Sequence, residues 1–179
     1  MITAYRTIFG LAMLAVLAGI LPRESFAAED TSLRVFSAWQ GQGHILQSGP
    51  QAATYIGVLS GRVYVDTEQG PIDSGEMVCP VIVRINLKDR SQQGSGQCTI
   101  TGTQGNLVFM ELNCTGVPLV GCAGDSTLTG GTGPFAQVTG GGHFVLRSSL
   151  TELASGPNAT LKDTASGIIF WRDLHYKIP

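Results

Sequence analysis

Short runs of apolar and strand-forming residues, namely Val, Ile, Leu, Thr and aromatics, recur along the chain between polar segments, and each run ends in glycine, asparagine or aspartate. The clearest is the segment 55–67, YIGVLSGRVYVDT, which is rich in β-branched and aromatic residues. An alternation of period two buries one face of a strand and leaves the other in solvent. No segment keeps a helical period over a convincing length, so the pattern predicts an all-β chain.

The predicted strands are separated by stretches of turn-forming residues. We expect loops or turns at 41–53, 70–76 and 88–96, where Gly, Ser, Gln, Pro and Asp gather. About eight or nine strands at a spacing of roughly 8 to 12 residues are typical of a sandwich or barrel, and short hairpin loops favour an antiparallel up-and-down order. The strands are predicted at 33–39, 55–67, 78–87, 97–103, 106–113, 123–129, 135–139, 143–150 and 168–176.

The stretch 128–144, LTGGTGPFAQVTGGGHF, is the strongest turn in the sequence. Glycine adopts a positive φ without steric cost, so this stretch predicts a tight turn between two strands. Gly131, Gly133 and Ala136 also match the dinucleotide pattern G-x-G-x-x-G/A. That pattern needs a helix after the turn, and here a glycine triplet and a strand-like period follow, so we favour the hairpin over a nucleotide site.

The N-terminus resembles a signal peptide. Arg6 supplies a basic start, residues 8–21 are uncharged and mostly apolar, and 25–27 offers small residues at a cleavage site. The apolar run is shorter than the roughly 20 residues that span a bilayer, so we expect cleavage and no stable membrane anchor. Residues 1–27 are therefore predicted to be a signal peptide, and residues 28–179 a single exported domain, periplasmic or secreted.

Composition limits the classes of partner. The chain has a net charge of −2, 13% charged and 43% hydrophobic residues, so it is far from the composition of disordered chains. The basic residues are not clustered in the sequence. We therefore expect neither nucleic acid nor an anionic membrane surface to be a partner.

The four cysteines are expected to form disulfides, because an even number in an exported chain is typical of an oxidising compartment. Cys114 and Cys122 bracket a predicted hairpin loop, and if residues whose numbers sum to 236 face one another, these two face. Cys79 would then join Cys98 by elimination. A zinc site is disfavoured by the long gaps, and one disulfide with two buried free thiols is the alternative.

Gly131-Thr132-Gly133-Pro134-Phe135, followed by Gly140-Gly141-Gly142-His143-Phe144, resembles the G-T-G-x-F … G-x-G-x-F turn and strand of the allene oxide cyclase and dirigent barrels, and of exported bacterial proteins that share the barrel. The likeness extends loosely from Tyr55 to about Arg147. It implies a closed eight-stranded antiparallel barrel with a hydrophobic cavity, in which Gly131, Gly133, Phe135, Gly140 and Gly142 are structural. It also implies homo-oligomers, which are frequent among the plant members. Their polar cavity residues cannot be aligned here, so no catalytic role is carried over.

Four side chains are candidates for lining a cavity. Glu111 lies among apolar residues, and a turn at Gln104-Gly105 would place it opposite Cys98. His143 has apolar neighbours, and Arg62 and Tyr64 share a face with Ile56 and Val58. For each of the four, an outward-facing surface position is the alternative.

The sequence contains no G-x-S-x-G nucleophile motif, no H-E-x-x-H zinc motif and no phosphate-binding P-loop. We therefore expect no cofactor and no metal. The acidic residues Asp66, Glu68, Asp73 and Glu76 do not follow the ligand order of a calcium loop. The first hypothesis is an exported, disulfide-stabilised barrel that binds a small apolar ligand or has a structural role. The alternatives are an isomerase or cyclase like the plant enzymes, and an envelope inhibitor or assembly partner.

Overall fold

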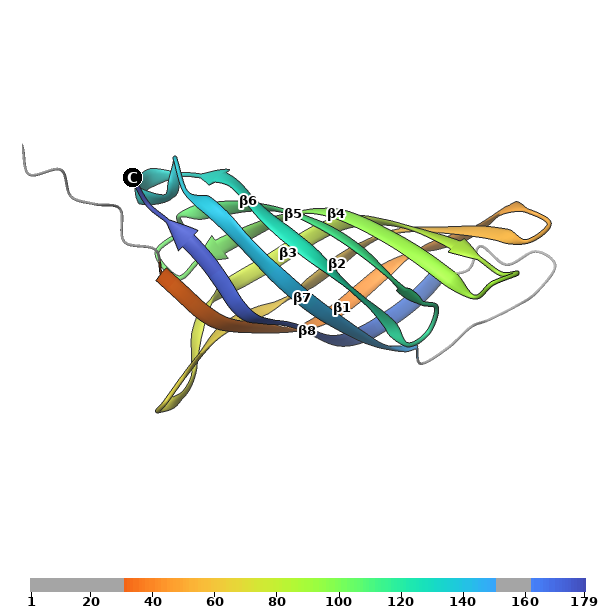
Figure 1. Cartoon of the computed structure of the whole chain (residues 1–179), viewed down its shortest axis with the longest axis horizontal. Coiled ribbons are helices and arrows are strands. Elements are labelled where there is room, and N and C mark those ends of the chain that lie inside the picture. The colour runs from red at the N-terminus through yellow and green to blue at the C-terminus, as the bar shows by residue number, and fades with distance from the viewer. Residues whose placement is uncertain (1–30, 151–161) are drawn as a thin grey trace, which may run out of the picture.

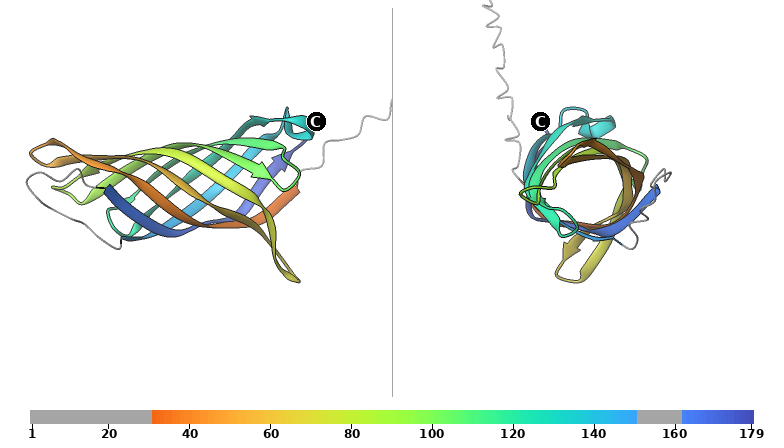
Figure 2. Two further views of the ribbon diagram at one scale, coloured as in Figure 1. Left: turned by 180° about the vertical axis from the view of Figure 1, so that it is seen from behind. Right: turned by 90° about the vertical axis from the view of Figure 1, so that its right-hand side faces the viewer.

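The structure, a computed structural model, describes residues 31–150 and 162–179. Each strand pairs antiparallel with the next, and the first also pairs with the last, so that the sheet closes into a barrel (Figures 1 and 2). This confirms the predicted all-β, eight-stranded, up-and-down architecture. The strands are β1 (Thr31–Gly49), β2 (Ala52–Thr67), β3 (Gly70–Asn86), β4 (Ser91–Gly102), β5 (Leu107–Val117), β6 (Gly121–Gly131), β7 (Thr139–Leu150) and β8 (Lys162–Lys177).

Alternation along the strands decides which side chains enter the barrel. On β1, Val35, Ser37 and Trp39 are buried, whereas the residues between them point outward and are less buried. The same period-two pattern holds on β3, where Met77, Cys79 and Val81 face inward. Apolar side chains of all eight strands thus share one interior, because inward positions alternate with outward ones around a closed sheet.

Four segments differ from the predictions. Residues 41–49 continue β1, residues 70–76 begin β3 and residues 91–96 begin β4, although all three are predicted to lie in loops or turns. All three carry glycines and polar side chains, but pairing with the neighbouring strand satisfies their backbone groups, and this tertiary pairing outweighs local propensity. Residues 135–138 are not a strand, because the β6–β7 connection contains a short 3₁₀ helix, η1 (Gly133–Phe135), and β7 begins only at Thr139.

The two ends of the barrel differ. The hairpins β1–β2, β3–β4 and β5–β6 gather at one end, which we call the mouth end; it lies at the right of Figure 1. There the Leu87 N–H donates to the Gln51 carbonyl at 2.9 Å, which joins two of these hairpins. The opposite half is filled by large buried side chains, namely Met77, Met110 and Trp171.

The described ranges form one barrel, and the predicted signal peptide at 1–27 lies outside the described residues. Within 31–150 and 162–179, no helix is long and apolar enough to cross a membrane.

Candidate functional site

A cavity of about 150 Å³ remains inside the mouth half of the barrel. Its wall is almost entirely apolar, because it is built from the inward positions of the strands and from the β5–β6 turn. Side chains that define it are Trp39, Tyr55, Val83, Leu112, Phe144 and Leu146. No carboxylate, imidazole, ammonium or guanidinium group contributes to this lining within the described part of the chain.

Glycines make room for the cavity. Gly94 faces inward on β4, and a β-carbon placed there would come 3.1 Å from the Sγ atom of Cys114. Across the barrel, the ring of Tyr55 lies against the backbone of Gly57, where a β-carbon would collide with it. A larger residue at either position would therefore fill or reshape the cavity.

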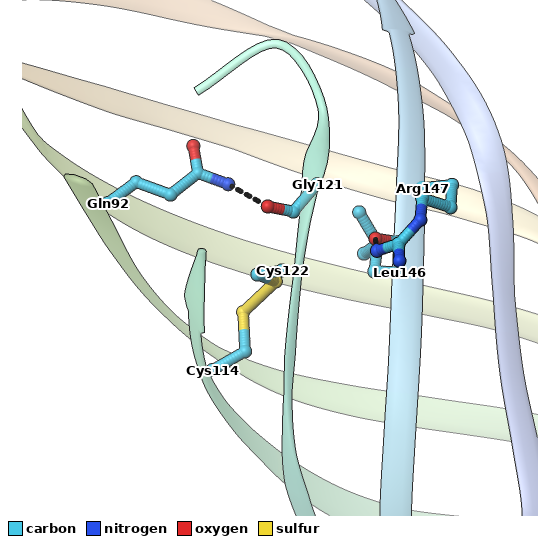
Figure 3. Close-up of a disulfide and its surroundings, with 6 residues drawn as sticks. All are labelled: Gln92, Cys114, Gly121, Cys122, Leu146 and Arg147. Carbon is cyan, nitrogen blue, oxygen red and sulfur yellow. Dashed lines mark hydrogen bonds between the residues drawn. A yellow bond between two sulfur atoms is a disulfide. The ribbon is translucent and has the colours of Figure 1, made fainter. Parts of the chain in front are cut away.

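Two disulfides cross the inner wall. Cys79 and Cys98 join β3 to β4 with their Cα atoms 4.0 Å apart, and Cys114 and Cys122 join β5 to β6 at 5.7 Å. Both pairs are those expected, and no cysteine of the described residues is free. The second bridge lies in the cavity wall near the Gln92 side chain, whose amide donates to the Gly121 carbonyl at 3.0 Å (Figure 3).

The register expected for Cys114 and Cys122 is wrong, although their pairing is right. Cys114 faces Gly124 and Cys122 faces Gly116, so the bridge runs diagonally between positions two residues apart. The turn contains three residues, and Leu119 at its centre has a φ of 69°. This left-handed residue allows a three-residue turn and shifts the facing pairs by two.

Buried polar atoms inside the barrel are satisfied unevenly. The hydroxyl of Ser126, which is buried, donates to the Gly142 carbonyl at 2.9 Å. The Nε1 atom of Trp39 and the hydroxyl of Ser37 are buried as well, and neither has a hydrogen-bond partner among the described residues. Of these two side chains, Trp39 also lines the cavity. Sequence patterns did not single it out, because a tryptophan on a strand predicts core packing whatever its N–H contacts.

The four candidate cavity residues lie on the outer face, so the prediction that they line the cavity is wrong. Arg62 and Tyr64 occupy outward positions of β2, since the inward face belongs to Leu59 and Val63. The Tyr64 ring stacks on that of Phe36, with centroids 5.3 Å apart.

Arg62 forms an ion pair with Asp73 across the β2–β3 hairpin. The hydrogen bond from Arg62 holds the pKa of Asp73 below its ordinary value, and the same bond raises the pKa of Arg62. The same hairpin carries the other three acidic residues noted in the sequence, Asp66, Glu68 and Glu76. No cluster that could hold a metal ion occurs within the described ranges.

Glu111 and His143 are exposed as well. Glu111 faces Gln97 rather than Cys98, because the β4–β5 turn is wider than the expected two residues, and it borders a shallow outer groove beside Pro80 and Ile82. On the outer face of strands β6 and β7, the Nδ1 atom of His143 lies 3.2 Å from the Asp125 carboxylate.

The turn residues of the β6–β7 connection lie where the glycine pattern placed them. Gly133 has a φ of 57° and Gly140 a φ of 139°, both in the region that favours glycine. A β-carbon on Gly140 would overlap the His175 carbonyl of β8, so this turn also needs glycine for close packing. Phe135 packs against the core, and Gly131 and Gly142 lie in the flanking strands.

Comparison with known proteins gives one kind of match. No protein-family model matches the chain, and no curated protein matches it. Among solved structures, a pterocarpan synthase dirigent protein is similar to this chain at 9% sequence identity, over 86% of this chain and 94% of that one, with a TM-score of 0.40. The assignment to the antiparallel barrels rests on the strand pairing of this chain itself.

Proposed function

We propose that this protein is an exported barrel that binds a small apolar molecule in its mouth-half cavity and does not transform it. The observation that carries the proposal is the apolar cavity of about 150 Å³, whose described lining holds no charged side chain. Apolar cavities of this size stay dry and accept molecules such as benzene. Binding there is favoured because it removes apolar surface from water.

The size and lining suggest the class of ligand. Pockets for larger ligands usually exceed about 300 Å³, so this cavity suits a single ring or a short chain. Trp39 lines the cavity, and its buried indole N–H has no hydrogen-bond partner among the described residues. A ligand with one acceptor oxygen would satisfy that donor, and an unsatisfied buried donor is costly. The ligand class is therefore a single-ring or short-chain molecule with one carbonyl or ether oxygen.

The lining supports binding over the cyclase alternative. Proton transfer needs an acid or base within hydrogen-bond reach of the reacting atom. Glu111 and His143, which could have supplied an acid or base, lie on the outer face of the barrel. Among the described lining residues, the phenol of Tyr55 is the one side chain that can ionise.

Export is supported by two independent features. The first 27 residues have the charge and apolar pattern of a signal peptide. The two disulfides fit an oxidising compartment, because cytosolic thiols are kept reduced.

The test uses a matched pair of variants and a matched pair of probes. Ser148 lines the cavity and Ser149 next to it is exposed on the outside. We expect Ser148→Phe to abolish binding of acetophenone in calorimetric titration, whereas Ser149→Phe binds like the unmodified protein. Ethylbenzene, which has a similar shape but no oxygen, should bind more weakly than acetophenone, and Trp39→Phe should remove that difference.

Circular dichroism of each variant checks that the barrel is intact. If neither probe binds the unmodified protein, or if Ser148→Phe and Ser149→Phe bind alike, the cavity is not the ligand site. Equal affinity for the two probes would refute the role of Trp39 alone.

A further inference from the structure

The three hairpins of the mouth end expose apolar side chains. We call Leu46, Leu87, Val117, Leu119 and Val120 the apolar rim; each is roughly half exposed. They come from the β1–β2, β3–β4 and β5–β6 hairpins, which are far apart in sequence. Tips of hairpins are usually polar, so three apolar tips around one opening mark an interaction surface.

Leu119 is the most telling member of the rim. Its φ of 69° is a left-handed conformation that glycine or asparagine adopts easily and leucine does not. Burial does not offset this local cost, because about half of the side chain is exposed. Backbone strain of this kind is frequent where a residue serves binding rather than folding.

Basic residues surround the same end. Arg84, Lys88, Arg90 and Arg147 are exposed near the mouth, where the described carboxylates are Asp89 and Asp125, the second of which borders the same outer groove as Arg84. Both carboxylate oxygens of Asp89 accept hydrogen bonds within the β3–β4 hairpin, from the side chains of Asn86 and Ser91. The mouth is thus positively charged although the whole chain has a net charge of −2.

The opposite end of the barrel is richer in acidic residues. The β2–β3 hairpin there carries Asp66, Glu68, Asp73 and Glu76, partly neutralised by Arg34 and Arg62. Charge is therefore separated along the barrel, with the positive end at the apolar rim. The fold gathers these basic residues from strands β3 and β7 and from the turn 87–90. They are therefore not clustered in the sequence, and the sequence alone argued against the anionic membrane partner that we propose next.

We propose that the mouth end docks on an anionic lipid bilayer. The rim side chains would enter the boundary between headgroups and acyl chains, as the apolar faces of interfacial helices do. The basic residues would lie at the level of anionic headgroups, each adding to the attraction. No membrane-spanning segment is required, because the contact is peripheral.

The positive charge and the apolar rim together favour a lipid bilayer over a second copy of the chain or a nucleic acid as the partner of the mouth end. Two copies meeting mouth to mouth would bring like charges together, which opposes association. A nucleic acid would satisfy the basic groups but would leave the leucine and valine tips against a polar backbone. Lipid supplies both an anionic surface and an apolar layer beneath it. If the proposed ligand site is correct, docking would also let an apolar ligand enter the cavity without crossing water.

The experiment is co-sedimentation of the disulfide-bonded protein with vesicles, in the absence of any ligand. We expect binding to phosphatidylcholine vesicles that contain phosphatidylglycerol, little binding to phosphatidylcholine alone, and weaker binding as salt is raised. The double variant Lys88→Gln/Arg90→Gln should lose affinity by about 30-fold, on the usual contribution of basic residues near anionic lipid. Arg34→Gln/Arg172→Gln changes the net charge equally at the opposite end and should bind like the unmodified protein.

Leu119→Gly separates docking from folding. Glycine relieves the left-handed backbone, so thermal stability should stay the same or rise, while vesicle binding falls by roughly 5-fold through the loss of an inserted side chain. Equal binding by the two charge variants would overturn the proposal, as would absence of binding to phosphatidylglycerol vesicles. A concentration-dependent dimer in analytical ultracentrifugation that Leu119→Gly abolishes would instead assign the rim to a second copy. Because no ligand is added, these outcomes do not depend on the proposed ligand site.

Discussion

Trp171 donates its indole N–H to the hydroxyl of Ser126 across 3.0 Å inside the barrel. Ser126 in turn donates to a β7 carbonyl, so that the donors of this chain of hydrogen bonds are all satisfied. Trp39, the second tryptophan, has no comparable partner among the described residues. One tryptophan is thus hydrogen-bonded within the protein, whereas the indole N–H of the other, which is part of the cavity wall, is buried without a partner among the described residues.

The two buried serines should respond differently to alanine. Ser126→Ala leaves the Trp171 N–H without its partner and removes the hydrogen bond to the Gly142 carbonyl, so we expect a loss of about 1 to 3 kcal/mol in the free energy of unfolding. Ser37→Ala removes a hydroxyl that is already unpartnered and should be neutral or stabilising. Urea denaturation of both variants measures the difference. A larger loss for Ser37→Ala than for Ser126→Ala would contradict this account.

The two disulfides should contribute unequally to stability. They close loops with sequence separations of 19 and 8 residues, and the longer loop loses more entropy in the unfolded chain. The chain-entropy relation gives about 3 kcal/mol for Cys79–Cys98 and about 2.5 kcal/mol for Cys114–Cys122. Denaturation of the two double Cys→Ala variants tests this order.

The pairing itself can be tested by non-reducing peptide mapping. Cleavage must occur between Cys98 and Cys114, for which Glu111 is suitable, and between Cys114 and Cys122, for which Leu119 is suitable. We expect linked peptides that contain Cys79 with Cys98 and Cys114 with Cys122. A peptide that links Cys98 to Cys122 would refute the pairing.

The ion pair between Arg62 and Asp73 should make a pH-dependent contribution to stability. Because the folded pKa of Asp73 is lowered from the ordinary 3.8, its contribution is present above that value and is lost as the pH falls through the folded pKa. A double-mutant cycle with Arg62→Gln and Asp73→Asn should show favourable coupling at pH 7 and none in strong acid. The coupling should be small, because both side chains are largely exposed. Coupling that grows on acidification would contradict the assignment.

Glu111 and His143 should be dispensable for ligand binding. Both lie on the outer face, so Glu111→Gln and His143→Gln should each change the free energy of unfolding by less than about 0.5 kcal/mol, the usual range for surface substitutions. Probe titration with acetophenone should give unchanged affinities. A loss of affinity in either variant would show that the outer face communicates with the cavity.

The sequence predicts the barrel well, because alternation and turn residues are local signals. Segment 55–67 has both and lies entirely within β2. Residues 41–49 were misassigned since Gly41 and Gly43 face inward, where strands usually place large apolar residues. Only the packing of Leu59 and Tyr55, on the neighbouring strand β2, shows why glycine is needed there.

The candidate site was harder to predict because it depends on register. A shift of one residue decides which face a side chain occupies, and the expected turn at Gln104-Gly105 placed Glu111 opposite the wrong partner. The basic mouth could not be recognised either, because Arg147 and Lys88 meet at one end only after the sheet closes. Whether Trp39 has a hydrogen-bond partner is likewise a property of three-dimensional packing.

Closure of the barrel also has a kinetic consequence. Strand β1 completes its pairing only when it meets β8, as in the contact of Phe36 with Phe170, so the first and last strands must both be present. Contacts between such distant residues slow folding, because loop closure must precede any gain from pairing. A growing chain could therefore not close the barrel until its last strand had been made. Late closure of this kind would suit the export that we propose, in which the disulfides form after the chain has crossed a membrane.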